Sequence, residues 1–264
     1  MLRIVFTALL AAGLCWSCTR NLVTGKSAMT LIPESQMIGM SETEYVKFLA
    51  EHPPLSSSDA RVQLVRTCGA KIQNAVEDFY SERKASDQLN GFNWEFNVVD
   101  DQTINAWCMP GGKVVVYTGL LPVTQSEEAL AVVMGHEIAH AVARHGNQRM
   151  SQGMLVQFGG EVLSVALLQK PAETQFLFQQ AYGITTGLGT LKYSRKHETE
   201  ADKMGLIFAA MAGYNPEVAI EFWTRMSQSG GQKPPQILST HPSDETRIND
   251  LRAFMPEAKK YYKP

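Results

Sequence analysis

Apolar side chains recur at the spacing of an amphipathic α-helix over much of the chain. The pattern predicts a helix over residues 34–51, which ends before His52-Pro53-Pro54. A second helix is predicted to begin after Ser57, Ser58 or Asp59, because any of these side chains can cap its first turn. A third helix begins near the capping signals of residues 124–128. Further helices are predicted at residues 191–213, 216–228 and 242–254.

Two stretches have the pattern of β-strands. Residues 93–100 (NWEFNVVD) alternate between apolar and polar side chains, and residues 113–119 (KVVVYTG) follow the turn Pro110-Gly111-Gly112. No linker is long or polar enough to divide the remaining chain into two domains. We therefore expect a mostly helical α+β fold with a small sheet, formed as a single domain by residues 18–264.

The first residues of the chain predict export. Residues 1–17 hold an early cation and an apolar run that is too short for a comfortable membrane span, as in a signal peptide. Cys18 follows the small Ser17 and precedes a polar stretch, which resembles a bacterial lipoprotein signal in which the cysteine is lipidated. A signal that is simply cleaved, with a soluble product, is the alternative. Residues 154–168 are also apolar, but they form a short run with a glutamate, so a buried or lid helix is favoured over a span.

The composition excludes some classes of protein. With 264 residues, 44% of them hydrophobic, and a formal net charge of −2, the chain is typical of a globular protein and offers no basic face for nucleic acid. In an exported protein Cys68 and Cys108 could pair. One lies in a predicted helix and the other follows a predicted strand, and nothing in the sequence brings them within bonding range. We therefore expect two buried free thiols.

The stretch VVMGHEIAHAVARHG carries candidate chemistry. His136 and His140 are four residues apart, so on a helix they project from one face and can reach the same zinc ion. Glu137 can then hold a water at the open position of the metal, as in the His-Glu-x-x-His signature of zinc hydrolases. The flanking residues are apolar, and these polar groups in a buried helix would be costly without the partner that a metal supplies.

A third protein ligand is needed, and the spacing leaves several candidates. His145 lies nine residues after the first histidine, on the opposite face of a continuous helix, so we interpret it as a surface residue or a residue that supports a ligand near the helix end. Glu198 and Asp202 share a helix face, so one could bind zinc while the other accepts the N–H of a ligating histidine. Glu200 points elsewhere, and His197 is a rival ligand that faces away from Asp202.

Four ordered motifs resemble those of the zinc endopeptidases of peptidase family M48: INAWCMPGGKVVVYTGLL, HEIAHAVARHG, SRKHETEAD and STHPSDETR. This family includes the CAAX prenyl endopeptidases, the HtpX-type heat-shock proteases and exported bacterial lipoproteins. The similarity runs from about Asn21 to about Arg252, so the tetratricopeptide tail of some exported relatives is not expected. The resemblance implies a zincin-like fold, in which the His-Glu-x-x-His helix lies beside a small sheet, with one zinc ion per chain.

The resemblance also implies roles for single residues. In the motif Glu-x-x-x-Asp it makes Glu198 the third zinc ligand and places Asp202 behind the ligands. Asn105 and Ala106 match the active-site edge strand, which pairs with an extended substrate through its backbone. A polypeptide substrate is the partner that such a strand implies.

A last motif, His-Pro-x-x-x-x-Arg, matches His241 and Arg247 to family residues that contact the substrate or the oxyanion. In some exported members this histidine also occupies the open position of the zinc and keeps the enzyme inactive. With Glu137 as general base, we expect a zinc endopeptidase, lipid-anchored on the periplasmic side of the bacterial outer membrane, that cleaves misfolded or misassembled envelope proteins. The alternatives are a zinc-binding lipoprotein that acts as a chaperone or assembly factor with latent proteolysis, and a hydrolase of non-peptide substrates.

Overall fold

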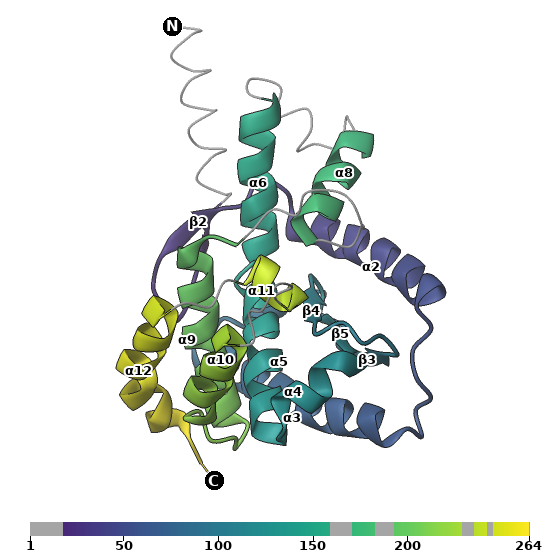
Figure 1. Ribbon diagram of the computed structural model, residues 1–264. Coiled ribbons are helices and arrows are strands. Elements are labelled where there is room, and N and C mark those ends of the chain that lie inside the picture. Colours follow the sequence, from purple (N-terminus) through teal and green to yellow (C-terminus); the bar gives the residue numbers. More distant parts are fainter. Residues whose placement is uncertain (1–17, 159–170, 183–192, 229–234, 242–244, 264) are drawn as a thin grey trace, which may run out of the picture.

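The computed structural model describes residues 18–158, 171–182, 193–228, 235–241 and 245–263, and in them the fold is mostly helical (Figure 1). The longer helices are α2 (Glu34–Glu51), α3 (Ala60–Glu82), α5 (Glu127–Val142), α6 (His145–Phe158), α8 (Pro171–Tyr182), α9 (Arg195–Met211), α10 (Val218–Gln228) and α12 (Glu245–Ala258). Shorter helical turns are η2 (Ser86–Leu89), η3 (Thr118–Leu120), α4 (Leu121–Thr124), α11 (Gln236–Thr240) and η5 (Lys259–Tyr261).

The predicted helices are present, and their starts follow the capping side chains. Helix α2 has the predicted bounds, and α3 begins after Asp59, whose carboxylate accepts a hydrogen bond from Arg61 N. Helix α5 begins after Ser126, whose hydroxyl accepts from Ala129 N. The apolar segment predicted at residues 154–168 begins in α6, and its residues 159–168 lie outside the described part of the chain.

The main sheet has three strands in the order β3–β5–β4. Strands β3 (Glu95–Val99) and β5 (Lys113–Tyr117) confirm the two predicted strands and run parallel. Strand β4 (Ala106–Met109) runs antiparallel to β5, and the residue pattern alone did not predict it. Its four residues AWCM are too short for a clear alternation. A separate two-stranded sheet pairs β1 (Cys18–Arg20) with β2 (Ser27–Met29).

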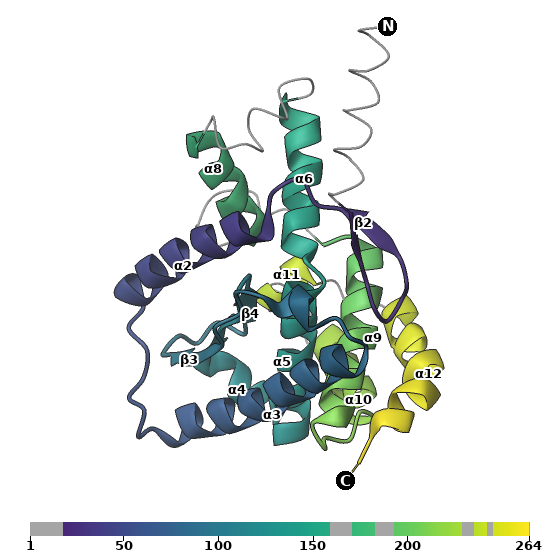
Figure 2. The same cartoon turned by 180° about the vertical axis from the view of Figure 1, so that it is seen from behind.

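Helices cover both faces of the three-stranded sheet, as the view from behind also shows (Figure 2). Val115 and Tyr117 of β5 pack with Phe48 of α2 in one apolar cluster. Val114 and Val116, the alternate side chains of the same strand, belong to the main core with α3 and α5. All five residues of β5 are buried, since this strand has neighbours at both edges and on both faces.

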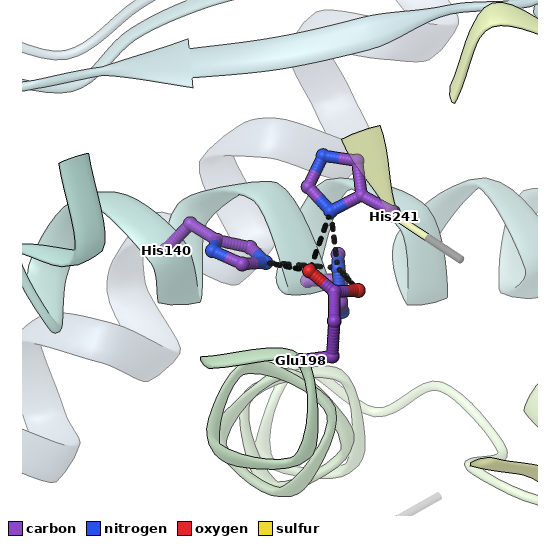
Figure 3. A group of neighbouring side chains, drawn as sticks. His140, Glu198 and His241 are labelled. Atoms are coloured by element: carbon purple, nitrogen blue, oxygen red, sulfur yellow. Dashed lines mark hydrogen bonds and ion pairs between the residues drawn. The ribbon is translucent and has the colours of Figure 1, made fainter. Parts of the chain in front are cut away.

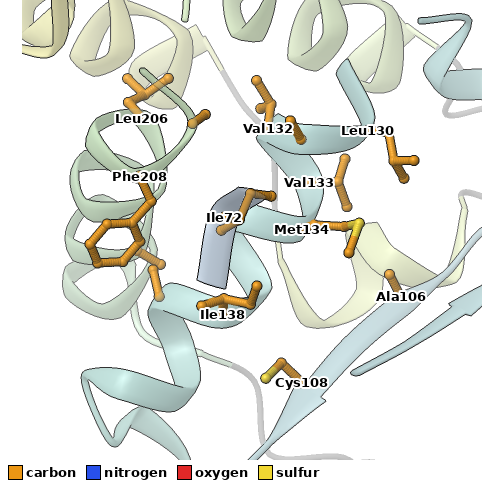
Figure 4. Close-up of a cluster of buried hydrophobic side chains, with 14 of the residues drawn as sticks. Ile72, Ala106, Cys108, Leu130, Val132, Val133, Met134, Ile138, Leu206 and Phe208 are labelled. Atoms are coloured by element: carbon orange, nitrogen blue, oxygen red, sulfur yellow. The ribbon is translucent and has the colours of Figure 1, made fainter. Parts of the chain in front are cut away.

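Helix α5 is the centre of the main core. Every residue from Ala129 to Val142 is buried, including the polar ones, and apolar side chains surround the helix (Figure 4). Its closest neighbour is α9, and the two helices meet at Gly135 and Gly205. A Cβ on Gly205 would lie 2.8 Å from the backbone nitrogen of His136, so only glycine permits this approach. The first half of α9 is thereby brought against the histidines of α5.

Several remaining predictions concern the N-terminus and the thiols. Cys68 and Cys108 are buried and unpaired, as expected, and Cys108 follows the predicted strand β3 but lies within the further strand β4. In the part of the chain that the structure describes, no helix combines the length and apolar character that a membrane crossing needs. The predicted signal peptide, residues 1–17, lies outside the described residues. Lipidation of Cys18 and the single domain over residues 18–264 stay predictions.

Candidate metal centre

Four buried side chains direct nitrogen and oxygen atoms at one another: His136, His140, Glu198 and His241. One such atom from each residue lies within 4.8 Å of the other three. None of the four residues is more than 5% exposed. Figure 3 shows how the carboxylate of Glu198 and the rings of His140 and His241 converge.

Three elements far apart in the sequence form this cluster. The two histidines of α5 lie one turn apart on one face of the helix, and Glu198 comes from the first turn of α9. His241 directly follows α11 and is its C-cap residue. Ile237 N of α11 donates a hydrogen bond to Ile104 O, at 3.3 Å, which ties this helix to the segment before β4. The histidine is therefore positioned by the edge of the sheet.

The distances in the cluster fit a tetrahedral metal ion. His136 Nε2 lies 3.0 Å from His140 Nε2, 3.2 Å from His241 Nδ1 and 3.5 Å from Glu198 Oε2. Glu198 Oε1 lies 3.4 Å from His140 Nε2 and 3.1 Å from His241 Nδ1. Zinc–ligand bonds of about 2.0–2.1 Å place the ligand atoms of a tetrahedral site about 3.3 Å apart. The four residues can therefore hold one zinc ion.

The positions of the protons also favour a cation. His136 Nδ1 lies 2.9 Å from Asp202 Oδ1, so Nδ1 carries a proton. Burial lowers the pKa of His136, but hydrogen bonds to Asp202 and Glu198 raise it to about 9, so a cation that binds at Nε2 takes the place of a second proton. Burial holds the pKa of His140 well below its ordinary value, so this ring is neutral. Glu198 Oε2 is buried and accepts no hydrogen bond from the described residues, although Arg247 Nη1 lies 3.4 Å away. Lone pairs that face one another in a buried site are stabilised by a bound cation.

Arg247 lies behind the ligands. Its Nε and Nη2 each donate to one oxygen of Asp202, both at 2.8 Å, and its guanidinium lies 3.6 Å from the centre of the Trp223 ring. Nη1 also lies 3.5 Å from His241 O. Arg247 therefore orients the carboxylate that in turn orients His136. Its predicted contact with an oxyanion stays a prediction.

Glu137 is placed to act as a base beside the cluster. It follows the first histidine on α5, is 3% exposed, and its Oε1 accepts no hydrogen bond within the described structure. His241 Nε2 lies 3.6 Å from this oxygen. Burial raises the pKa of Glu137 above its ordinary value of 4.5, which strengthens it as a proton acceptor.

Strand β4 is an edge strand of the three-stranded sheet, and Ala106 at its start is 3% exposed. Tyr117 N donates to Asn105 O at 3.1 Å, so Asn105 is hydrogen-bonded to the inner strand. Alternate residues of an antiparallel strand face opposite neighbours, and the N–H and C=O of Ala106 therefore point away from β5. Among the described residues no strand pairs with this edge. It can accept an extended chain as a further strand.

The interpretation of His145 as a surface residue was wrong. It assumed one continuous helix, whereas α5 ends at Val142 and Arg144 adopts a left-handed conformation with φ 58°. His145 begins α6, is completely buried, and places Nδ1 3.0 Å from His140 Nδ1. Its other nitrogen lies 3.2 Å from Glu200 Oε2. The alternative interpretation, a residue that supports a ligand, fits the contact with His140. Glu200, which the helical spacing placed away from the site, contacts His145.

Two further residues of the site were missed. The Tyr193 ring packs on His140 and His241, with centroid distances of 3.9 and 4.9 Å. The guanidinium of Arg149 lies 3.3 Å from the centre of the Tyr193 ring. Neither residue stands in a recognisable motif, so no pattern in the sequence indicated them. His197, the rival ligand, lies outside the four-residue cluster.

Comparison with known proteins identifies relatives over most of the chain. The sequence profile described as peptidase family M48 matches residues 69–255. The mitochondrial metalloendopeptidase OMA1 of Arabidopsis thaliana is 38% identical over 177 residues, which cover 67% of this chain and 34% of the relative. The corresponding protein of Homo sapiens is 32% identical over 247 residues, or 90% of this chain and 46% of the relative.

A bacterial relative is also similar. The putative beta-barrel assembly-enhancing protease of Vibrio cholerae is 28% identical over 216 residues, which cover 79% of this chain and 42% of that protein. The chain therefore spans less than half the length of these three curated relatives.

Proposed function

The chain belongs to peptidase family M48, and from this premise we propose that it is a zinc-dependent endopeptidase of the bacterial cell envelope. One observation carries the proposal: the buried donor atoms of His136, His140 and Glu198 fit three corners of a tetrahedral zinc ion, and beside them lies a Glu137 oxygen that has no hydrogen-bond partner among the described residues. His136, His140 and Glu198 are the proposed ligands, and Asp202 orients the first of them. A zinc ion bound there would supply a Lewis acid and an activated water.

The residues of the chain perform the proton transfers of peptide hydrolysis. Glu137 accepts a proton from the attacking water and later returns it to the leaving amine. Its buried position keeps the carboxylate unsolvated, and its raised pKa suits both steps. The Nε2 atom of His241 lies on the same side, within 3.6 Å of Glu137, and can donate to the developing oxyanion.

The open edge of β4 favours a polypeptide substrate over a small amide or ester. The outward backbone groups of Ala106 can pair with an extended chain, and such pairing requires no particular side chain. Extended segments are accessible in unfolded and misassembled proteins. We propose these as the substrates, and the Vibrio cholerae relative is named a putative beta-barrel assembly-enhancing protease.

The envelope location rests on the sequence of the N-terminus. Residues 1–17 have the composition of a signal peptide and Cys18 has the position of a lipidated cysteine. A lipid anchor would hold the protein at the periplasmic face of the outer membrane. The names of the OMA1 relatives place those proteins in mitochondria, so the location is a proposal that needs its own measurement by fractionation.

A second candidate function is that of a zinc-binding chaperone or assembly factor with latent proteolysis. The position of His241 favours it, because Nδ1 lies 3.2 Å from His136 Nε2 and 3.1 Å from Glu198 Oε1, where a fourth ligand belongs. A fourth protein ligand would exclude the attacking water from the zinc ion.

Casein cleavage and zinc content of the purified protein test both functions. For Glu137→Gln we expect unchanged zinc content and a loss of cleavage of about 10²–10⁴-fold, the usual contribution of a general base. Glu128→Gln, on the same helix but outside the cluster, is the control and is expected to cleave like the wild type. Zinc bound by all variants with cleavage by none would favour the assembly factor. A wild-type protein that binds no zinc would refute the proposal.

A further inference from the structure

The two histidines of α5 are supported in different ways. His136 donates from Nδ1 directly to the carboxylate of Asp202, a common arrangement for a metal ligand. His140 Nδ1 faces another imidazole instead, at 3.0 Å from His145 Nδ1. Two nitrogen atoms at this distance form a hydrogen bond only if one of them carries a proton and the other does not.

The next contact decides which nitrogen carries the proton. His145 Nε2 lies 3.2 Å from Glu200 Oε2, and an ionised carboxylate only accepts hydrogen bonds. Nε2 of His145 is therefore protonated, and the neutral ring leaves Nδ1 as the acceptor. His140 Nδ1 must then be the donor, so the lone pair of His140 Nε2 points into the cluster, as a zinc ligand requires.

The chain continues to the N-terminal segment. Thr24 Oγ1 donates to Glu200 Oε1 at 2.8 Å, so both oxygens of this carboxylate are engaged. Thr24 lies between β1 and β2, more than one hundred residues before the histidines. The outer end of the chain of hydrogen bonds is thus fixed by a segment that belongs to none of the helices of the site.

The backbone is strained where the chain turns to make this contact. Residues at spacing i, i+5 do not face each other on a continuous helix, so His145 reaches His140 only because Arg144 adopts φ 58°. A left-handed conformation is unfavourable for a residue other than glycine. Arg144 is held by Glu34, 3.4 Å from its Nε, and by a hydrogen bond to Gln88 O. Such strain is typical of positions where local geometry serves a site.

From these contacts we infer that His145 and Glu200 are positioning residues, which fix the tautomer and the ring orientation of the zinc ligand His140. The inference rests on the proposed function, because it assigns the hydrogen bonds from Glu200 through His145 to His140 to the same metal site. It predicts that loss of these hydrogen bonds weakens zinc binding even when all proposed ligands remain in place.

The test compares two stacked histidines. His145 and His197 have ring centroids 4.6 Å apart and an interplanar angle of 23°, and both are buried. Among the contacts described, the His145 ring is hydrogen-bonded to the proposed ligand His140, whereas the His197 ring is hydrogen-bonded to Gln148. Zinc dissociation constants are measured by competition with a chromophoric chelator on metal-stripped protein, without substrate. His145→Phe is expected to bind zinc about 10–100-fold more weakly, the usual effect of removing a partner of a metal ligand. His197→Phe is expected to bind like the wild type, and His145→Asn, whose amide oxygen can accept from His140, to recover part of the loss.

Zinc affinity of His145→Phe equal to that of the wild type, in a protein with an unchanged thermal unfolding midpoint, would overturn the inference. Equal losses in His145→Phe and His197→Phe would overturn it too, because they would indicate a packing effect. Should His145→Phe not fold, Glu200→Ala takes its place, with the half-buried neighbour Thr199→Ala as control, and equal zinc affinities of these two variants refute the inference. A wild-type protein without zinc affinity would count against the proposed function instead.

Discussion

Asp202 and Arg247 are joined by two parallel hydrogen bonds of 2.8 Å in the interior of the protein. Both side chains are about 6% exposed. The pair compensates two charges that would otherwise be buried alone, and it holds the carboxylate against His136 Nδ1.

Arg247→Met is expected to lower the free energy of unfolding by about 3–5 kcal/mol, because it leaves the charge of Asp202 buried and unpaired. Urea unfolding of the metal-stripped protein measures the loss without any contribution from zinc. The control is Lys259→Met, which removes an exposed ion pair with Glu217 and should cost less than about 1 kcal/mol. Similar losses in the two variants would show that the buried pair has no special role. The double variant Arg247→Met/Asp202→Asn should recover part of the stability.

Gly205→Ala is expected to weaken both folding and zinc binding. The added methyl group would meet the backbone of Gly135 and His136 at 2.8–3.0 Å, so α9 must move away from α5 and carry Glu198 with it. Gly39→Ala is the matched control, since a Cβ there has no neighbour within 4 Å and α2 should gain up to about 1 kcal/mol from the better helix former. The thermal unfolding midpoint should therefore fall in Gly205→Ala and rise in Gly39→Ala. Zinc titrations should show weaker binding by Gly205→Ala than by Gly39→Ala. A Gly205→Ala protein with wild-type zinc affinity would contradict the role of this crossing.

Removal of zinc is expected to lower the thermal unfolding midpoint, because the native protein binds the ion and the unfolded chain does not hold the ligands together. At a free zinc concentration about 1,000 times the dissociation constant the expected stabilisation is about 4 kcal/mol. Calorimetry with and without a chelator measures the shift. In Glu198→Ala, which lacks one proposed ligand, the shift should be strongly reduced. An equal shift in this variant would mean that the ion binds elsewhere.

His241→Ala is expected to increase casein cleavage while it weakens zinc binding. The substitution removes the Nδ1 atom from the fourth position of the cluster and leaves room for water there. Both quantities are measured on the same preparation, so that activity is expressed per bound zinc. A fall in cleavage per zinc would instead assign His241 to oxyanion stabilisation.

Asp101, which precedes the edge strand β4, should make the stability of the fold depend on pH. Hydrogen bonds from the hydroxyl and the backbone N–H of Thr103 lower the pKa of Asp101 below its ordinary value of 3.8. A carboxyl group with a lowered pKa in the folded state stabilises it above that ordinary value, and the contribution is lost as the pH falls through the folded-state pKa. Asp101→Asn keeps an acceptor but does not titrate. The difference in urea midpoint between wild type and variant should therefore shrink between about pH 5 and pH 2, and a constant difference would contradict the assignment.

The sequence was sufficient for the elements whose signals are local. Helical spacing and the caps at Asp59 and Ser126 predicted α2, α3 and α5, because a side chain that bonds to its own first turn acts over three residues. Strand β4 gave no such signal, since its four residues become a strand only by pairing with β5. That Cys108 lies within a strand was missed for the same reason.

The same distinction between local signals and tertiary contacts applies to the site. The spacing of His136, Glu137 and His140 by itself determined that these side chains share a helix, and it left Glu198 and Asp202 as candidates on one face of a second helix. The sequence could not show that His145 turns back onto His140, because that depends on the left-handed Arg144. Nor could it show which carboxylate meets which imidazole, because α5 and α9 meet only through tertiary packing at two glycines. Helix periodicity is a property of neighbours along the chain, whereas the choice of partners in a buried site is decided by the packing of segments that are distant in the sequence.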